Sequence, residues 1–207
     1  MNMRIEKIEI SNILSFTGEY TIDFTCEPLK SAKIFAVTGA SGQDITAILD
    51  AICLVLYGKK YVWSVNASTS SLMTDSISPD CLSSGTGKGI VRLTFSMNDG
   101  QRYEAEWIGR QKKSSSHIEV SRILRQLSPV SRQWKGESNV NQSINALLGL
   151  NFPQFVFSAV LSPWRFMPFL SATPDEKGRL LERLTGTEIY GQMSRTVFSR
   201  RSEAYKE

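Results

Sequence analysis

The first 128 residues are dominated by alternation of apolar and polar side chains, the pattern of half-buried β-strands. Ile8 and Ile10, for example, are separated by the charged Glu9. Asn98-Asp99-Gly100 between two alternating runs is typical of a hairpin turn. The alternation predicts strands over residues 4–13, 20–24, 90–97, 102–108 and 118–127.

A continuous apolar run at residues 33–38 is typical of a fully buried strand. Residues 45–57 have the period of an apolar helix, and Gly58 fits its C-cap. Residues 59–89 carry clusters of Ser, Thr, Asn and Gly and are predicted to be loop-rich.

The apolar period changes from two to about 3.6 after Gly136, which predicts helices. Thr173, Pro174 and Glu176 are suited to the N-cap, first and third positions of one of them. The pattern predicts helices over residues 139–148, 152–161 and 173–184, and a last one from residue 187. We therefore expect an α/β fold with a mixed sheet around the strand at 33–38, an antiparallel β-meander and a C-terminal helical subdomain.

Residues 39–46 read Gly-Ala-Ser-Gly-Gln-Asp-Ile-Thr and match part of the phosphate-binding pattern G-x-x-x-x-G-K-[ST]. Gly39 opens the match and Thr46 closes it, but Asp44 replaces the second glycine and Ile45 replaces the lysine. The chain thus has the strand, loop and helix of an ATPase without the cation that holds the phosphates. The candidate nucleotide-binding positions are Gly39, Ser41, Gly42, Asp44, Ile45 and Thr46.

Three further stretches are specific enough to indicate a family. They are Tyr-Thr-Ile-Asp-Phe at 20–24, Leu-Asp-Ala-Ile-Cys-Leu-Val-Leu-Tyr-Gly at 49–58 and Leu-Leu-Glu-Arg-Leu-Thr-Gly-Thr-Glu-Ile-Tyr-Gly at 180–191. With them the chain resembles the N-terminal lobe of SbcC, the bacterial relative of eukaryotic Rad-fifty. These SMC-like ATPases process DNA ends with a nuclease partner. The resemblance implies a half-domain of the P-loop NTPase type, as in ABC and SMC heads.

The resemblance also implies a division of the chain and a missing half. We expect a β-rich lobe over residues 1–135, a helical subdomain over 136–186 and the root of a coiled-coil helix over 187–207. Family members continue into a second lobe with the signature motif, the Walker B acidic pair and the switch histidine, none of which is present here. The chain is therefore expected to be part of a longer protein or a naturally free half.

The sequence departs from the family at the positions that handle nucleotide. Leu161-Ser162 is followed by Pro163, where the family's Q-loop has a glutamine that reaches the metal and the attacking water. We expect no catalytic residue in this chain and no cofactor, since binding of the ATP and Mg²⁺ implied by the family is weakened or lost. The opposing interpretation is that Lys59 or Arg165 substitutes for the lost cation.

Charge is distributed unevenly. The net charge is +4, but residues 88–135 hold ten Lys and Arg against four Asp and Glu, a balance of +6, which leaves −2 elsewhere. A basic segment on a near-neutral body suggests nucleic acid, although a solvated β-meander would look the same. The candidates for contacts to duplex DNA are Arg110, Lys112, Lys113, Arg122, Arg125, Arg132 and Lys135.

Several classes of function are disfavoured by the sequence. No apolar run reaches the roughly 18 residues of a membrane span, and the N-terminus lacks a signal region. Three widely spaced cysteines, Cys26, Cys53 and Cys81, indicate a reduced, cytoplasmic setting. His117, the only histidine, has no partner at ligand spacing, so we expect no metal site.

Three hypotheses follow. The first is a degenerate SbcC-like head lobe that serves as a non-catalytic DNA-binding or protein-interaction module in a DNA end-processing, repair or defence complex. Its partners would be duplex DNA, an SbcC-type head, an SbcD-like nuclease subunit or a second copy of the chain, with no membrane involved. The second is the lobe of an active ATPase completed by a missing or separate half. The third is a decoy that inhibits a host SbcC–nuclease complex.

Overall fold

The structure, a computed structural model, describes the chain in segments that form two compact units. The units are Met1–Phe152 and Pro153–Glu207, and each is treated by itself. The described residues are 3–32, 34–38, 42–61, 73–74, 81–111, 118–128, 132–159, 178 and 188–204.

A six-stranded sheet forms the frame of the first unit. Its strands are β1 (Met3–Ile13), β2 (Phe16–Asp23), β5 (Lys88–Met97), β6 (Arg102–Gln111), β7 (Ile118–Ser128) and β8 (Arg132–Lys135). They lie in the order β2-β1-β5-β6-β7-β8, and every neighbouring pair is antiparallel. Two shorter strands, β3 (Lys60–Tyr61) and β4 (Met73–Thr74), pair with each other.

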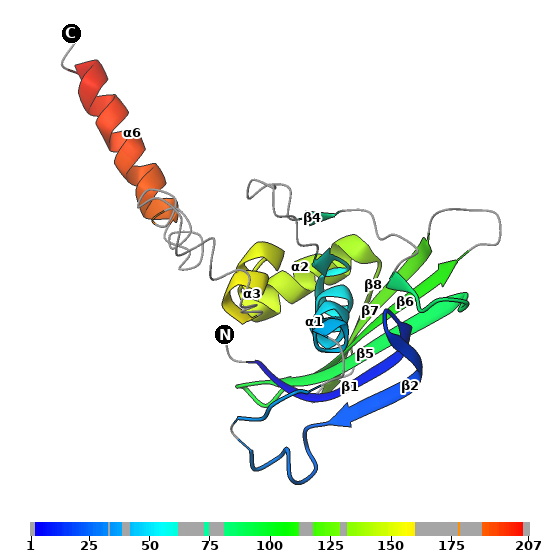
Figure 1. The fold of residues 1–207 in the computed structure, drawn as a ribbon. Helices are drawn as coiled ribbons and strands as arrows, with labels where there is room; N and C mark the ends of the chain where they lie inside the picture. The colour runs from blue at the N-terminus through cyan, green and yellow to red at the C-terminus, as the bar shows by residue number, and fades with distance from the viewer. Residues whose placement is uncertain are drawn as a thin grey trace. The chain divides into compact units, whose positions relative to one another are not determined.

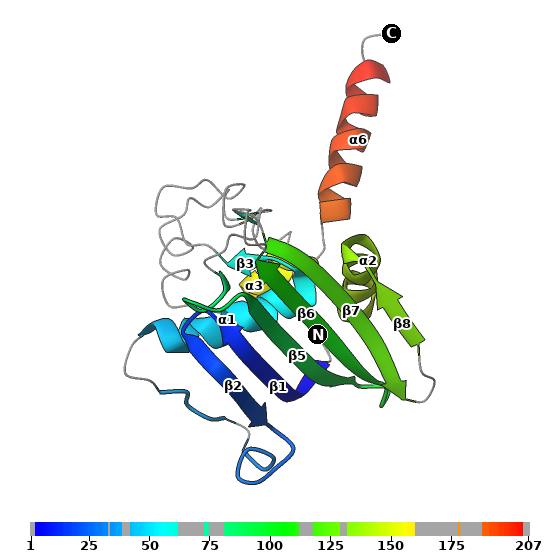
Figure 2. The ribbon, with the colours of Figure 1, turned by 90° about the vertical axis from the view of Figure 1, so that its right-hand side faces the viewer.

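Two helices cover one face of this sheet. Helix α1 (Gly42–Tyr57) packs on β5 and β6, and α2 (Glu137–Leu148) packs on β7 and β8 (Figure 1). Figure 2 looks onto the strands and shows α1 crossing behind them. The opposite face of the sheet carries the alternate, mostly polar residues of each strand, as the pleat requires.

The core lies between the sheet and α1. Ile10 of β1, Val91 of β5 and Trp107 of β6 follow one another across the sheet and are buried. Leu54 and Val55 of α1 are fully buried as well. The expected α/β fold is therefore confirmed.

The sheet differs from the prediction in one respect. It is antiparallel throughout, whereas we expected a mixed sheet around residues 33–38; residues 34–38 belong to no described strand. The predicted alternating strands are present, and β8 was missed because it is short and lies on the sheet's edge, where only one neighbour supports it.

A buried arginine joins α1, α2 and the sheet. Arg122 of β7 is 2% exposed, and its guanidinium donates to the backbone oxygen of Leu56 at 2.6 Å and to Asn141 Oδ1 at 2.6 Å. Gly58 caps α1 with φ 66°, and its N–H donates to the Leu54 oxygen. A Cβ at Gly58 would lie 2.9 Å from Arg122 Nη1, so the predicted glycine cap is also what lets the arginine reach the helix end.

The second unit is described mainly through its helices. Helix α3 (Phe152–Ala159) begins at the division between the units, and α6 (Glu188–Ala204) is the last described helix. Met193, Val197 and Phe198 of α6 are exposed. The predicted helix over 173–184 lies outside the described residues except Gly178. The division predicted at residue 136 stays a prediction, while the compact units divide at Phe152 instead.

Ion pairs connect the strands on the face away from the helices. Glu106 accepts hydrogen bonds from Arg92 at 2.7 Å and from Arg125 at 2.9 Å, and Arg125 also reaches Glu104 at 2.6 Å. Burial alone would raise the pKa of the Glu106 carboxyl, but the two arginines outweigh it and hold that pKa below its usual value. Glu106 therefore stabilises the fold in its ionised form.

We predict that Arg122→Met destabilises the protein by about 3 kcal/mol, because it leaves the buried Leu56 oxygen and the part-buried Asn141 Oδ1 without their donor. Urea unfolding at pH 7 measures the loss. Arg110→Met, which removes the same charge from an exposed position, is the matched control and should change the free energy of unfolding by less than about 0.5 kcal/mol. Equal losses of unfolding free energy in the two variants would contradict a role of buried Arg122 in holding α1 and α2 to the sheet.

We predict that Glu106→Gln lowers the free energy of unfolding by about 1–2 kcal/mol at pH 7, where hydrogen bonds to an ionised carboxylate are strongest. Since the folded pKa lies below the unfolded value of about 4.3, this stability is present above that value and is lost as pH falls through the folded pKa. Urea titrations from pH 7 to pH 3 should show the gap between parent and variant closing. A gap that is independent of pH would exclude the ionised carboxylate as its cause.

Candidate functional site

The phosphate-loop positions lie at the N-terminal end of α1. The helix begins at Gly42 rather than at the predicted residue 45, so Asp44 and Ile45 have helical backbone. Thr46 is exposed within the first turns. Gly39 and Ser41 lie outside the described residues, and so does the shape of the loop before Gly42. The described half of the loop, residues 42–46, is therefore helical, and α1 extends three residues further back than predicted.

Helix α1 itself supplies no cation for Mg²⁺–ATP. The first four backbone N–H groups of a helix have no intrahelical partner and can face an anion. However, the 16 residues of α1 include no Lys or Arg, and Asp44 adds a negative charge to the first turn. The positive helix end is thus the only described feature of this site that attracts phosphate, and it is opposed by a carboxylate.

Substitution of the missing cation by Lys59 does not agree with the fold. Lys59 follows the C-terminal end of α1, while Ile45 is in its first turn. At a rise of 1.5 Å per residue the two positions are roughly 20 Å apart, beyond the reach of a lysine side chain. Arg165 and the Q-loop position Pro163 lie outside the described residues, so their part in the site stays a prediction.

The segment before the loop is apolar and exposed, and the prediction of a buried strand there is wrong. Ile34 is 92% exposed, Phe35 48% and Val37 45%, and residues 34–38 form no described strand. Within the described residues only Phe24 stacks on the segment, with its ring centroid 5.4 Å from that of Phe35. No described strand or helix of this chain covers the segment, although its composition is apolar.

The basic residues proposed for DNA do not form one surface. Arg122 is buried and bound to α1 and α2, which removes it from the candidates. Arg125 is bound by two carboxylates, and burial, which lowers its pKa, is outweighed by these partners, which raise it. Lys112 and Lys113 lie outside the described residues. The exposed candidates that remain are Arg110, Arg132 and Lys135.

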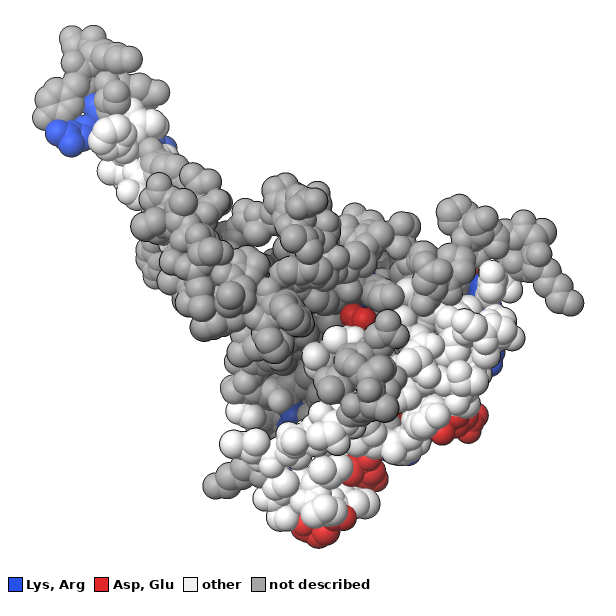
Figure 3. All heavy atoms as spheres, viewed as in Figure 1, with Lys and Arg blue, Asp and Glu red and all other residues white. Residues whose placement is uncertain are grey.

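The strand register places Arg132 on a different face of the sheet from Arg110 and Lys135. On β8, Lys135 lies opposite Ile123 on the outward face, whereas Arg132 lies opposite Gln126 on the face of the helices. Arg110 lies opposite Glu119. On the face drawn in Figure 3, the described part of the first unit shows acidic side chains along its lower edge and no continuous basic patch.

One signal in the sequence could have found a role that the charge count missed. Arg122 is two residues before the buried Leu124, so alternation alone places it on the inward face of the strand. The ion pair of Glu6 in β1 with Arg102 in β6, at 2.7 Å, joins strands that are not neighbours and has no local signal. The balance of +6 along the segment overstates its surface charge, because Arg122 is buried and Glu6 from outside the segment pairs with Arg102.

The described residues offer neither a metal centre nor a membrane span. No group of three or more His, Cys, Asp or Glu side chains in that part of the chain could hold a metal ion. No helix in the described residues is long and apolar enough to cross a bilayer. His117 lies outside the described residues.

Comparison with known proteins identifies the family. The AAA domain family matches residues 7–205. The chain is 32% identical to the SbcC subunit of the nuclease SbcCD from Pseudomonas aeruginosa over 212 residues, which covers 98% of the chain and 18% of that protein. It is also 32% identical to the Rhodobacter capsulatus protein of the same name over 218 residues, covering 99% of the chain and 17% of the relative.

A third relative extends the similarity beyond proteins of that name. The "Probable DNA double-strand break repair Rad50 ATPase" of Aquifex aeolicus is 28% identical over 186 residues, which covers 90% of the chain and 17% of that protein. The chain thus spans about a fifth of the length of these curated relatives. The resemblance found in the motifs is confirmed: the chain belongs to the AAA domain family, as an N-terminal ATPase-head lobe of the SbcC/Rad50 type.

Proposed function

We propose that this head lobe is a non-catalytic protein-interaction module of a DNA end-processing, repair or defence complex. The observation that carries the proposal is the exposed apolar segment at 34–38, which leads directly into a phosphate loop without its cation. Matched relatives are named as part of a nuclease and as a double-strand break repair ATPase, which supports a complex of this kind.

Loss of nucleotide binding rests on the charges at the start of α1. One unit charge pair at about 4 Å and an effective dielectric of about 20 is worth roughly 4 kcal/mol before desolvation. Ile45 forgoes most of that attraction, and Asp44 adds repulsion of the same order if it faces the phosphates. Even a third of the sum weakens binding about a hundredfold, since 1.4 kcal/mol is tenfold. Catalysis by this lobe is therefore disfavoured.

Protein is favoured over duplex DNA as the principal partner. Apolar side chains on an extended segment are suited to adding a strand from another polypeptide, with backbone hydrogen bonds giving affinity and side chains giving specificity. Large exposed apolar surface on a single chain is typical of such interfaces. The basic candidates, by contrast, do not lie together. Arg122 is buried, Arg125 is held in ion pairs, and Arg132 and Lys135 lie on opposite faces of β8. The partner we propose is an SbcC-type second head half or an SbcD-like nuclease subunit.

We predict that the chain does not bind Mg²⁺ with a non-hydrolysable ATP analogue more tightly than about 10 μM in calorimetric titration. The double variant Asp44→Gly with Ile45→Lys should raise the affinity about a hundredfold or more, because it restores the cation and removes the carboxylate. Lys59→Ala is the matched control and should leave the affinity for the ATP analogue unchanged, since this lysine lies at the opposite end of α1. Tight binding by the parent chain would favour the active-ATPase hypothesis.

We predict that Ile34→Asp with Val37→Asp abolishes association of the chain with its partner protein, because charges cannot be buried in an apolar interface without partners. The readouts are light scattering of the pure chain and capture of a purified SbcC-type head half or nuclease subunit. Leu127→Asp alters an exposed apolar side chain on β7 and should leave association unchanged. A monodisperse parent that captures neither protein would overturn the proposal.

A further inference from the structure

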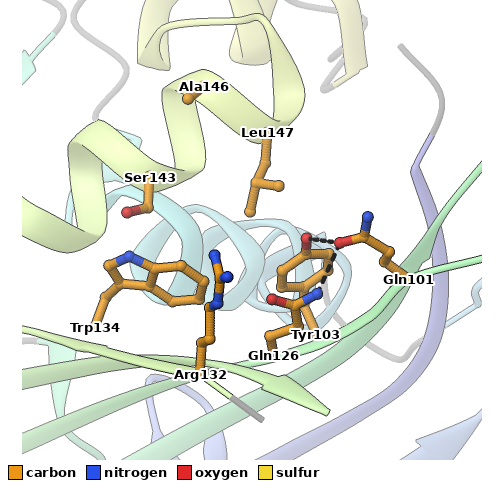
Figure 4. A pocket seen from close by; sticks show the side chains of 8 residues that line it. All are labelled: Gln101, Tyr103, Gln126, Arg132, Trp134, Ser143, Ala146 and Leu147. Atoms are coloured by element: carbon orange, nitrogen blue, oxygen red, sulfur yellow. Dashed lines mark hydrogen bonds between the residues drawn. The ribbon is translucent and has the colours of Figure 1, made fainter. Parts of the chain in front are cut away.

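A pocket of about 380 Å³ lies between the end of the sheet and α2, away from the phosphate loop. Figure 4 shows Arg132 and Trp134 of β8, Gln126 of β7, Tyr103 of β6 and Gln101, which directly precedes β6, around the pocket. All belong to the first unit, and Leu147 of α2 closes the pocket from above. The volume is at the lower end of the range of small-ligand sites.

The polar end of the pocket is held in place by hydrogen bonds. The Tyr103 hydroxyl donates to Gln101 Oε1 at 2.6 Å, and Gln126 Nε2 donates to the same oxygen at 2.8 Å. Tyr103 and Gln126 are buried, at 4% and 8% exposure. Because Gln101 Oε1 already accepts two hydrogen bonds, Gln101 Nε2 keeps a donor for a ligand and Gln126 Oε1 keeps an acceptor.

The other end combines a cation with a flat apolar surface. In Figure 4 the Arg132 guanidinium lies between the Trp134 indole and Gln126. Arg132 is exposed and forms no ion pair with any carboxylate of the described residues, unlike Arg125 on the neighbouring strand. Trp134 is half-buried, so part of its ring remains accessible. An unneutralised guanidinium beside an indole attracts an anion that is attached to a planar group.

We propose that this pocket binds one unpaired nucleotide, with its phosphate at Arg132, its base against the Trp134 ring and the edge of the base at the glutamine amides. A bare anion would use only the arginine, and an apolar ligand would leave the amides unmet. Stacking on aromatic rings and amide contacts to base edges are the means by which proteins hold unstacked bases. Paired bases inside a duplex cannot enter, so the site discriminates unpaired from paired nucleotides.

The nucleotide can come from two sources, a free mononucleotide or the single-stranded end of a nucleic acid. Fluorescence anisotropy with a labelled oligothymidine ten nucleotides long tests the strand, and competition by thymidine monophosphate tests the free nucleotide. A blunt duplex of equal length tests the discrimination. The full chain is used, and circular dichroism checks that each variant is folded.

The variants address the two ends of the pocket. Trp134→Ala should weaken binding of the oligonucleotide about tenfold or more, and Trp134→Phe should retain most of it, because stacking needs only a ring. Arg132→Gln should also weaken binding and lower the salt slope by about one unit. Lys135→Gln removes the same charge from the opposite face of β8 and should leave affinity within about twofold.

Displacement by the mononucleotide at similar concentration would assign the site to free nucleotides, and binding of the strand alone would assign it to strand ends; either result supports the proposal. Equal affinity for blunt duplex and single strand would overturn it. So would pocket variants that bind as the parent does. Binding of a glutamate-rich peptide through Arg132, without oligonucleotide binding, would overturn it in favour of a protein contact.

Discussion

The buried guanidinium of Arg122 sets the relative position of α1, α2 and the sheet. A charge in a dry interior is costly without hydrogen-bond partners, and here Nη1 and Nη2 of Arg122 donate to Asn141 Oδ1 and to the Leu56 backbone oxygen. The carbonyl end of a helix also carries partial negative charge, which favours a cation at that place. Because α1 is held at its C-terminal end, its other end is presented about 24 Å away by the rise of 16 residues. The position of the candidate phosphate loop thus depends on an arginine at the far end of the helix.

The same need to match charges shapes the outward face of the sheet. Arg92 and Arg125 each reach a glutamate on a neighbouring strand, and Arg102 of β6 reaches Glu6 of β1 across β5. Hydrogen bonds across strands stabilise the sheet. The glutamates also neutralise the charge of these arginines, which weakens the attraction of the sheet for a polyanion. Arg132 differs because it lies on the inward face of the edge strand, beyond the reach of those glutamates. An isolated cation beside Trp134 is suited to a small anionic ligand rather than to a long phosphate backbone.

Much of the first unit could be predicted because its features are local. Alternation located the strands and even places Arg122 inward with Leu124, and the caps Gly58 and Gly149 follow from the need for a left-handed residue after a helix. The pairing of Glu6 with Arg102 could not be predicted, since it joins residues that are distant in sequence. The pocket was missed for the same reason, as Gln101, Gln126 and Trp134 come from separate parts of the sheet. For residues 34–38 the prediction was wrong, because an apolar composition alone does not show whether the rest of the chain folds over the segment.

The exposed segment at 34–38 and the altered phosphate loop differ in what their side chains contribute. An apolar run contributes to whatever interface covers it, whereas a loop lysine contributes only to holding phosphate and takes no part in packing. Replacing the lysine by Ile45 therefore weakens one ligand without disturbing the strand register, the core or the Arg122 clamp. Under the proposed function, the exposed Ile34 and Val37 would associate with a partner in the absence of nucleotide. Such a head lobe would separate two properties that an ATPase head combines, because its association with a partner would not need a bound phosphate.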